Sequence, residues 1–276
     1  MKLRFSKMHG LGNDFMVIDG INQKYIPLQS QISNWADRHF GVGFDQLLLV
    51  EKTDHEDALF RYRIFNADGS EVAQCGNGAR CFARFVREQG LTDATRIPVE
   101  TKAGLLQLEM IDDELVRVNM GVPEFRPWRI PFKAAARAEY YPLEINGQTL
   151  QLSAVAIGNP HAVLQVEDVD EADVEDIGPA IESHPDFPDR VNVGFMQVVD
   201  RANFRLRVYE RGTGETLACG SGACAAMAAG QVAGLLDSAA TVSLPGGELH
   251  LEWQGEGYPV MMTGGASMVY QGEISL

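Results

Sequence analysis

Short runs of alternating or β-branched apolar residues recur along the chain, and this pattern is typical of strands. Turn-forming pairs such as Asn146-Gly147 and Gly246-Gly247 separate them. The strand-like runs read LLLV, LLQLEM, LVRVNM, VAIGNPHAVLQV, VGFMQVV and LHLEW. The pattern therefore predicts many short strands in both halves of the chain.

Four segments have the pattern of helices. Residues 77–89 gather apolar side chains on one face, which predicts an amphipathic helix. Its polar positions are Arg80, Arg84 and Arg87. Residues 220–236 are apolar nearly all round, so this helix should be enclosed by other structure. Further helices are expected near residues 30–40 and 174–183.

An internal repeat organises the chain. Residues 71–79 read EVAQCGNGA and residues 215–223 read ETLACGSGA, so both fit the pattern E-x-x-x-C-G-x-G-A. The cysteines of the two motifs, Cys75 and Cys219, lie 144 positions apart. Each motif follows a strand-like run and precedes an expected helix. The repeat indicates two homologous halves.

Weaker echoes of the repeat place polar residues at matching positions. Asn13 and Asn159 lie 146 positions apart, and so do Gln46 and Asn192. Asn66 and Glu210 each lie nine positions before the cysteine of their motif. These residues are candidates for the same site as the cysteines, although asparagines are also common in turns.

The expected fold is α/β of the α+β kind, with two pseudo-symmetric domains. Each domain is predicted to be a curved, mostly antiparallel sheet around a central helix, with the active site in the cleft between the domains. We place the N-terminal half at 1–130, carrying Cys75, and the C-terminal half at 131–276, carrying Cys219. The C-terminal strand is expected to pack back on the first half.

Composition narrows the range of functions. The chain has 276 residues, of which 45% are apolar and 22% charged, so it can form a sizeable core. Lys plus Arg number 23 against 38 Asp plus Glu, which gives a formal charge of -15. Such an acidic protein repels phosphate backbones, so nucleic-acid binding is not expected.

The sequence also indicates a location. It shows no signal peptide and no apolar stretch long enough for a membrane span, so we expect a cytoplasmic protein without membrane association. Four cysteines in a chain of this length do not form a disulfide scaffold. Each cysteine is therefore judged separately, as a core residue or as part of the chemistry.

The repeated cysteines suggest a particular chemistry. A thiol at the start of a helix lies near unpaired amide N–H groups and the positive end of the helix dipole, so it should lose its proton more easily. The adjacent glycines let the backbone approach a ligand carboxylate. Two such thiols on opposite faces of one substrate carbon would invert it, one removing a proton and the other donating one. This two-base racemisation or epimerisation needs one thiolate and one thiol, and no cofactor.

Other interpretations of the motifs are weaker. Cys81 and Cys224 are expected to be core residues, since unpaired cysteines are commonly buried. Spacings of C-x5-C and C-x4-C do not fit a typical zinc cluster, so no metal is expected. A Cys-His-Asp hydrolase stays possible but would not explain a duplicated nucleophile. The sequence contains no G-x-G-x-x-G motif and no P-loop, so nucleotide binding has no support. No lysine lies in a recognisable pyridoxal-phosphate context.

On these motifs the sequence closely resembles the diaminopimelate epimerase family, cofactor-independent enzymes of bacterial lysine and cell-wall precursor synthesis. The resemblance extends over essentially the whole chain. It is carried by KMHGLGNDF, GFDQLL, FNADGSEVAQCGNGARC, GNPHAV, RVNVGFM, YERGTGETLACGSGAC and LPGG. The two cysteine motifs together are highly specific.

The resemblance implies that LL- and meso-2,6-diaminopimelate are interconverted, with Cys75 and Cys219 as the acid/base pair. His161 and Glu210 are similar to family residues that adjust the cysteine protonation states, although His161 also suits a buried core position. Arg211 suits a bidentate carboxylate contact. The implied substrate-binding residues are Asn13, Gln46, Asn66, Gly76, Asn77, Asn159, Asn192, Glu210, Arg211, Gly220 and Ser221.

The resemblance also implies a homodimer, with Tyr270 at the dimer interface, and a small-molecule substrate as the ligand. Two other functions stay open on the sequence. One is a racemase of another amino acid, such as the proline racemases, which share the two-cysteine logic. The other is a binding protein of the same fold, which would have no reason to keep a cysteine in both halves.

Overall fold

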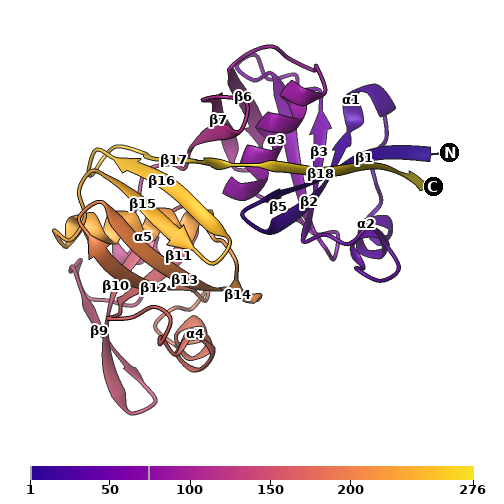
Figure 1. Ribbon diagram of the computed structural model, residues 1–276. Helices are drawn as coiled ribbons and strands as arrows, with labels where there is room; N and C mark the ends of the chain where they lie inside the picture. Colours follow the sequence, from indigo (N-terminus) through magenta and orange to yellow (C-terminus); the bar gives the residue numbers. More distant parts are fainter. Residues whose placement is uncertain (1, 74) are drawn as a thin grey trace. The chain divides into compact units, whose positions relative to one another are not determined.

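The computed structural model describes residues 2–73 and 75–276, and these residues form two compact units. Unit 1 contains the residues up to Asn119 together with Thr263–Leu276, and unit 2 is Met120–Met262. The first change of unit thus comes earlier than the expected boundary after residue 130. The C-terminal segment belongs to unit 1, where β18 (Ser267–Ser275) pairs antiparallel with β1 (Lys2–Gly10) (Figure 1).

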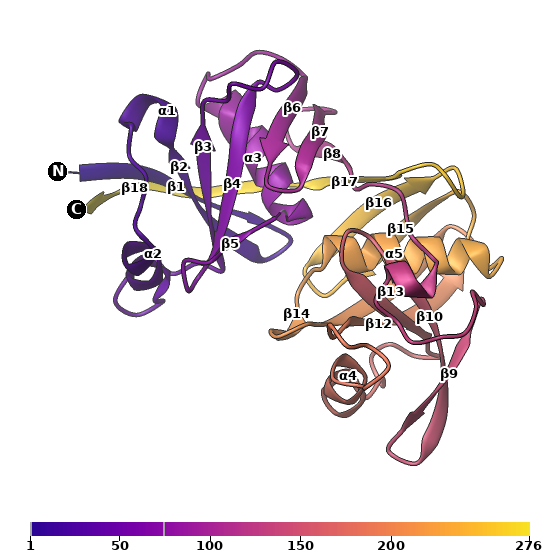
Figure 2. The same cartoon turned by 180° about the vertical axis from the view of Figure 1, so that it is seen from behind.

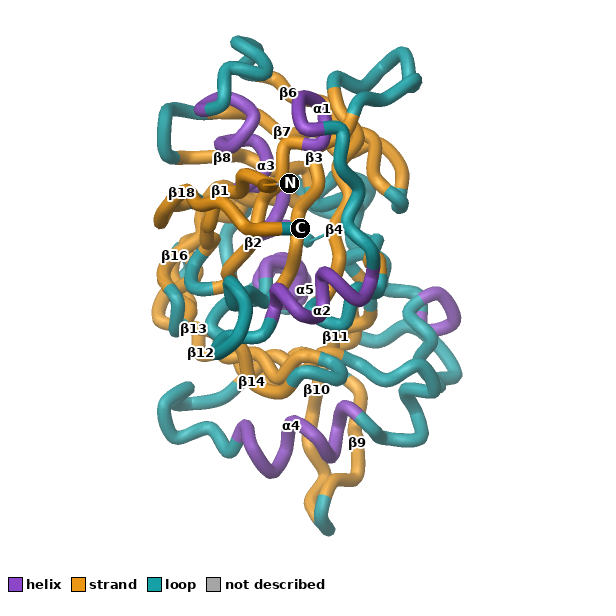
Figure 3. The backbone as a smooth tube through the Cα atoms, turned by 90° about the vertical axis from the view of Figure 1, so that its right-hand side faces the viewer, coloured by secondary structure: helices purple, strands orange, loops and turns teal. Residues whose placement is uncertain are grey.

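Unit 1 contains most of its elements in the first 119 residues. After β1, these are β2 (Asn13–Asp19), α1 (Gly20–Gln23), α2 (Gln29–Ala36), β3 (Gln46–Glu51), β4 (Phe60–Asn66), β5 (Glu71–Val72), α3 (Gly76–Glu88), β6 (Arg96–Thr101), β7 (Gly104–Met110) and β8 (Leu115–Asn119). Strands dominate the described chain, and helices are few (Figure 3).

Unit 2 repeats this element order. Its elements are the 3-10 helix η1 (Pro127–Arg129), β9 (Tyr141–Ile145), β10 (Gln148–Ala156), β11 (Pro160–Gln165), α4 (Val174–Glu182), β12 (Asn192–Asp200), β13 (Asn203–Glu210), β14 (Gly214–Thr216), α5 (Gly220–Val232), β15 (Ala239–Leu244) and β16 (Gly247–Trp253). Strand β17 (Val260–Gly265) carries the chain from unit 2 into unit 1.

Strand pairing confirms the duplication. In unit 1, β2 pairs parallel with β3, β3 antiparallel with β4, β4 antiparallel with β5, and β4 parallel with β6. In unit 2, β11, β12, β13, β14 and β15 repeat these four pairings in the same order and directions. The register is also repeated, since Phe15 aligns with Gln46 in one unit and His161 with Asn192 in the other. The expected α+β class is confirmed.

Each unit has a helix packed along its sheet, as the sequence predicts. Helix α5 is buried along almost its whole length and packs on β10, β11, β12, β13 and β16 (Figure 2). It ends at Val232, earlier than the expected residue 236. Gly234 adopts a φ of 69°, and its N–H bonds back to the Gln231 carbonyl, so the glycine terminates the helix.

Helix α3 departs from the expected amphipathic pattern at one position. Arg80 occupies one of the polar positions of this helix, but its side chain is fully buried. Its Nε donates to the Gly265 carbonyl at 3.0 Å, and Arg84 donates to the Ala266 carbonyl. Both arginines therefore hold the returning C-terminal segment of unit 1 against α3.

The other two expected helices are present, and α2 ends earlier than predicted. Helix α2 ends at Ala36, because Asp37 is extended and its Oδ1 accepts the N–H groups of His39 and Phe40. Helix α4 agrees closely with the expected range. No helix in the described part of the chain is long and apolar enough to cross a membrane.

Candidate active site

Each repeated cysteine lies directly before the central helix of its unit. Cys75 is the N-cap of α3 and Cys219 is the N-cap of α5, and both have extended backbones. The N-cap position arises because a short strand ends just before the cysteine and the C-G-x-G sequence then begins the helix. The first helical turn leaves backbone N–H groups without intrahelical partners, which suits an anionic ligand group. Gln74, within the first motif, lies outside the described residues.

In unit 1 the predicted amide residues lie at one edge of the sheet. Asn13 begins β2, Gln46 begins β3 and Asn66 ends β4. Because β2 and β3 run parallel and β4 antiparallel to them, these three positions are neighbours. Gln46 Nε2 donates to Asn66 Oδ1 at 3.0 Å, and Asn66 Nδ2 donates to Ser70 Oγ at 3.2 Å. The structure thus brings Gln46 and Asn66 into direct contact.

Asn13 links this edge to the cysteine. Its Oδ1 accepts a contact of 3.7 Å from Cys75 Sγ and a hydrogen bond of 3.3 Å from Asn77 Nδ2. Cys75 is half-buried, and its carbonyl accepts a hydrogen bond from Tyr62 Oη at 3.3 Å. Burial raises the pKa of Tyr62, so its phenol keeps this proton. We call Cys75 with Asn13, Gln46, Asn66 and Asn77 the N-terminal cysteine site.

An acidic residue that the sequence analysis missed fixes the orientation of Asn13. Asp45 Oδ2 accepts from Asn13 Nδ2 at 3.0 Å, which turns the amide oxygen of Asn13 toward Cys75. Arg38 in turn donates to Asp45 Oδ1 at 2.7 Å and to Asp14. The only sequence signal for Asp45 was its place beside Gln46 in GFDQLL.

The amide residues of unit 2 occupy the corresponding edge. Asn159 Oδ1 lies 3.0 Å from His161 Nε2, and Asn192 begins β12 beside His161. Asn192 Nδ2 donates to the Pro160 carbonyl at 3.0 Å, while its Oδ1 accepts from the Arg211 backbone N–H at 3.0 Å. Asn192 therefore fixes the backbone at Arg211.

His161 is buried and neutral. It is 1% exposed, and burial together with the charge of Arg211 lowers its pKa to about 3. Because Asn159 Oδ1 is an acceptor, Nε2 carries the proton, and Nδ1 has no hydrogen-bond partner among the described residues. The counterpart in unit 1 is the apolar Phe15, so the two units differ here.

Cys219 has a charged neighbour, Glu210. Its Sγ donates to Glu210 Oε2 at 3.1 Å, and Ser221 Oγ lies 3.6 Å from the same sulfur. Thr216 Oγ1 donates to the other carboxylate oxygen, Oε1, at 2.6 Å. We call Cys219 with Asn159, His161, Asn192, Glu210 and Ser221 the C-terminal cysteine site.

The expectation that a thiol at a helix start loses its proton more easily is wrong for Cys219. Burial raises the pKa of this thiol well above its usual range, and the charge and hydrogen bond of Glu210 raise it further. The Ser221 hydroxyl and the Gly222 backbone oppose this shift without overcoming it. Cys219 therefore holds its proton in this conformation.

The remaining predicted site residues lie at the two helix starts and directly after β13. Gly76 and Asn77 form the first turn of α3, and Gly220 and Ser221 that of α5. Arg211 is exposed, and its Nη1 donates to the Asp189 carbonyl at 2.8 Å.

Two further expectations concern Tyr270 and metal binding. Tyr270 on β18 is 44% exposed and makes an edge contact with Phe5. Within residues 2–73 and 75–276, no group of three or more His, Cys, Asp or Glu side chains is placed to hold a metal ion.

The other two cysteines are separate from these sites. Cys81 and Cys224 are fully buried in α3 and α5, which confirms the expected core positions. Burial raises the pKa of Cys81 to about 12, so this thiol is unsuited to proton transfer near neutral pH. Cys75 and Cys219, by contrast, are each a thiol beside an oxygen acceptor.

Comparison with known proteins gives a consistent result. The family model described as Diaminopimelate epimerase matches residues 5–126 and 153–269. Proteins named diaminopimelate epimerase from Nitrosomonas europaea and Chromobacterium violaceum are each 59% identical to this chain over 276 residues, with 100% of both sequences covered. The protein of that name from Pseudomonas syringae pv. tomato is 57% identical, also with 100% of both sequences covered.

Solved structures show the same fold at much lower identity. A hydroxyproline epimerase from Agrobacterium vitis superposes with a TM-score of 0.72 at 17% identity, covering 100% of this chain and 93% of that chain. A predicted epimerase from Pseudomonas aeruginosa has a TM-score of 0.70 at 17% identity and covers 99% of each chain. At this identity the likeness shows the fold alone.

Proposed function

Because the chain belongs to the diaminopimelate epimerase family, a family of isomerases, we propose that it interconverts LL- and meso-2,6-diaminopimelate without a cofactor. The observation that carries the proposal is the duplicated cysteine at the N-cap of a central helix. A binding protein would have no use for the same reactive group in both units.

In the proposed reaction, Cys75 and Cys219 act on opposite faces of one α-carbon. The thiolate of one cysteine takes the α-proton, so that a C–H bond breaks and an S–H bond forms. The thiol of the other cysteine gives its proton to the opposite face, so that an S–H bond breaks and a C–H bond forms. The direction of reaction decides which cysteine is the base. After each turnover the thiolate has become a thiol and the thiol a thiolate. Proton exchange with solvent then restores the starting protonation states.

The neighbours of the two sulfurs support this division of roles. Glu210 stabilises the protonated form of Cys219, which favours Cys219 as the proton donor and Cys75 as the base in the resting enzyme. Cys75 faces the neutral amide oxygen of Asn13. His161 stays neutral and so adds no positive charge near Asn159.

The substrate has two amino-acid ends, and the two sites offer groups for both. The first turns of α3 and α5 suit the carboxylate at the reacting centre, where negative charge develops in the transition state. We assign Arg211 to the distal carboxylate and Glu210 to an ammonium group. The amide side chains of Asn13, Gln46, Asn66, Asn159 and Asn192 complete the substrate contacts in this proposal.

We further propose that the enzyme works in the cytoplasm as a homodimer, in the synthesis of lysine and cell-wall precursors. Tyr270 is the proposed interface residue, and its partial exposure on β18 supports this assignment. A Tyr270→Ala variant should elute as a smaller species than the unchanged chain in size-exclusion chromatography with light scattering. Elution as the same species would exclude Tyr270 as an essential contact.

The proposed reaction is tested by following α-hydrogen exchange by NMR in D2O. The reduced protein, with no added cofactor, is offered LL-diaminopimelate, proline and other amino acids. Deuterium entering only diaminopimelate, with formation of the meso isomer, is the expected result. Exchange in proline instead would change the substrate but keep the mechanism. No exchange by folded, reduced protein would support the binding-protein alternative.

A further inference from the structure

An arginine–glutamate pair occurs at the same place in both units. Arg63 Nε and Nη2 donate to the two carboxylate oxygens of Glu71 at 2.9 and 3.0 Å. Arg207 Nε and Nη2 donate to the two oxygens of Glu215 at 2.6 and 2.8 Å. The two glutamates are the first residues of the repeated cysteine motifs, and each arginine comes eight positions earlier. The bidentate geometry is therefore duplicated with the motif itself.

Both pairs join the two strands of a hairpin that leads to the cysteine. Arg63 lies on β4 and Glu71 on β5, which has two residues, while Arg207 lies on β13 and Glu215 on β14, which has three. Such short strands have few backbone hydrogen bonds to keep them on the sheet. A bidentate side-chain pair across the hairpin thus adds a second attachment to the sheet.

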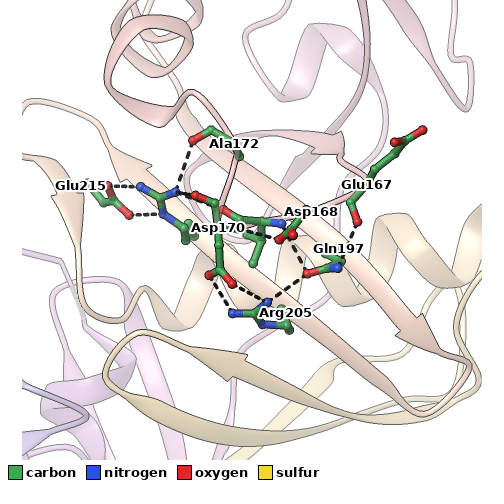
Figure 4. Close-up of polar contacts among 9 residues, drawn as sticks. Glu167, Asp168, Asp170, Ala172, Gln197, Arg205 and Glu215 are labelled. Atoms are coloured by element: carbon green, nitrogen blue, oxygen red, sulfur yellow. Dashed lines mark hydrogen bonds and ion pairs between the residues drawn. The ribbon is translucent and has the colours of Figure 1, made fainter.

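The guanidinium group of Arg207 is itself held in place. Its Nη1 donates to the carbonyls of Val169 and Ala172 at 3.0 and 3.2 Å, in the loop before α4. Figure 4 shows Glu215 on one side of this guanidinium and the loop, with Ala172, on the other. Arg207 is 22% exposed at the side chain, so water competes only partly for these contacts. The carboxylate of Glu215 is therefore bound to a fixed group.

A chain of contacts connects the Arg207–Glu215 pair to the reactive sulfur. Thr216 follows Glu215 in β14, and its hydroxyl donates to Glu210 Oε1 at 2.6 Å. The other oxygen, Glu210 Oε2, accepts the Cys219 thiol at 3.1 Å. Movement of β14 would move Thr216 and release the carboxylate that faces Cys219.

We propose that Arg207 and Glu215, and by repetition Arg63 and Glu71, are positioning pairs that hold each cysteine hairpin in its reactive geometry. The pairs do not touch the sulfurs. They act through the short strand and, in unit 2, through Thr216 and Glu210. This inference rests on the proposed function where it concerns turnover, but its effect on the Cys219 thiol does not depend on the substrate.

The test uses Arg207→Lys, which keeps the positive charge but cannot form the two-pronged contact. Glu215→Gln, which keeps the shape of the side chain, provides a second variant. The matched control is Arg137→Lys. Arg137 also lies in unit 2 and makes a similar bidentate pair with Glu256, to which its Nη1 donates at 2.8 Å and its Nη2 donates as well. Neither Arg137 nor Glu256 belongs to a cysteine motif or to the loop that holds Arg207.

Two readouts separate positioning from general stability. A small displacement of a reacting group lowers turnover strongly, so kcat of Arg207→Lys should fall on the order of 10- to 100-fold with little change in KM. The pH profile of Cys219 alkylation, measured by peptide mass spectrometry, should shift to lower pH as Glu210 moves away. Arg137→Lys should match the unchanged chain in both kcat and the alkylation profile, and thermal unfolding reports whether each variant is folded.

An unshifted Cys219 alkylation profile in both Arg207→Lys and Glu215→Gln overturns the proposal, whatever the turnover. Turnover of these variants equal to that of Arg137→Lys overturns it as well. If the unchanged chain does not epimerise diaminopimelate, the proposed reaction fails, and the alkylation profile alone then decides the positioning role.

Discussion

The thiol of Cys219 donates a 3.1 Å hydrogen bond to Glu210 Oε2. The corresponding position in unit 1 is Asn66, a neutral residue that bonds to Gln46 and Ser70 instead. The repeat thus conserves the thiol but changes the charge beside it. In the proposed reaction this difference keeps a proton on Cys219, so that one cysteine is a thiol when the other is a thiolate.

Replacing Glu210 by Gln tests this relationship, because Gln keeps the side-chain shape and removes the charge. We expect the pKa of Cys219 to fall toward its ordinary value, and its alkylation profile to shift to lower pH. Glu248→Gln, at an exposed position on β16, is the control and should leave the profile unchanged. An unshifted profile for Glu210→Gln would show that Glu210 does not hold the Cys219 proton.

His161 should make stability depend on pH. Its pKa is about 3 in the folded chain, against about 6.5 when unfolded, so below pH 6.5 the unfolded state binds an extra proton. The free energy of unfolding should therefore fall as the pH decreases from about 6.5 toward 3, by up to about 1.4 kcal/mol per pH unit from this group.

His161→Phe provides the comparison, because Phe15 occupies the matching position in unit 1. Denaturant unfolding between pH 7 and pH 4 should give a less steep loss of stability for this variant. The slopes are compared rather than the absolute stabilities, since the substitution also changes packing. Equal slopes would show that His161 is not held neutral in the folded chain.

Removing either reactive sulfur should stop the reaction without unfolding the chain. Cys75→Ala or Cys219→Ala should lower epimerisation by several orders of magnitude, because each lacks one of two essential proton carriers. Cys81→Ala removes a fully buried thiol from α3 and should keep turnover close to normal, with some loss of stability. Near-normal turnover in either of the first two variants is incompatible with two-base chemistry.

The sequence was sufficient to predict the duplicated architecture and the position of each repeated cysteine at a helix start. The repeated motif places Cys75 and Cys219 at helix starts, and the matched amides Asn13, Gln46 and Asn66 do lie at one sheet edge. These features follow from local patterns, namely strand runs, glycines and the spacing between them.

Features that depend on burial were not predictable in the same way. The raised pKa of Cys219 comes from desolvation and from a carboxylate nine residues away, which outweigh the local effect of the helix start. Arg80 is buried because a carbonyl of the distant C-terminal segment accepts its Nε proton. Asp45 orients Asn13 through a side-chain contact that spacing does not reveal.

Oxidation should inactivate the enzyme through the same two sulfurs. In the proposed reaction both sulfurs face one α-carbon, so a disulfide can form once the substrate has left, provided that the site closes far enough to bring the sulfurs into contact. Peptide mapping of the oxidised, inactive protein should find Cys75 joined to Cys219, and a thiol reductant should restore activity. Inactive protein in which both thiols remain reduced would contradict this expectation.

The position of deuterium after partial reaction tests the two-base mechanism most directly. LL-diaminopimelate is converted in D2O to a small extent, and both isomers are recovered and analysed by NMR and mass spectrometry. A separate proton donor on the opposite face places solvent deuterium at the inverted centre of the meso product, while the remaining LL substrate keeps its α-hydrogen. A product that retains the original hydrogen, or equal labelling of both isomers from the start, would indicate a single base and contradict the paired roles of Cys75 and Cys219.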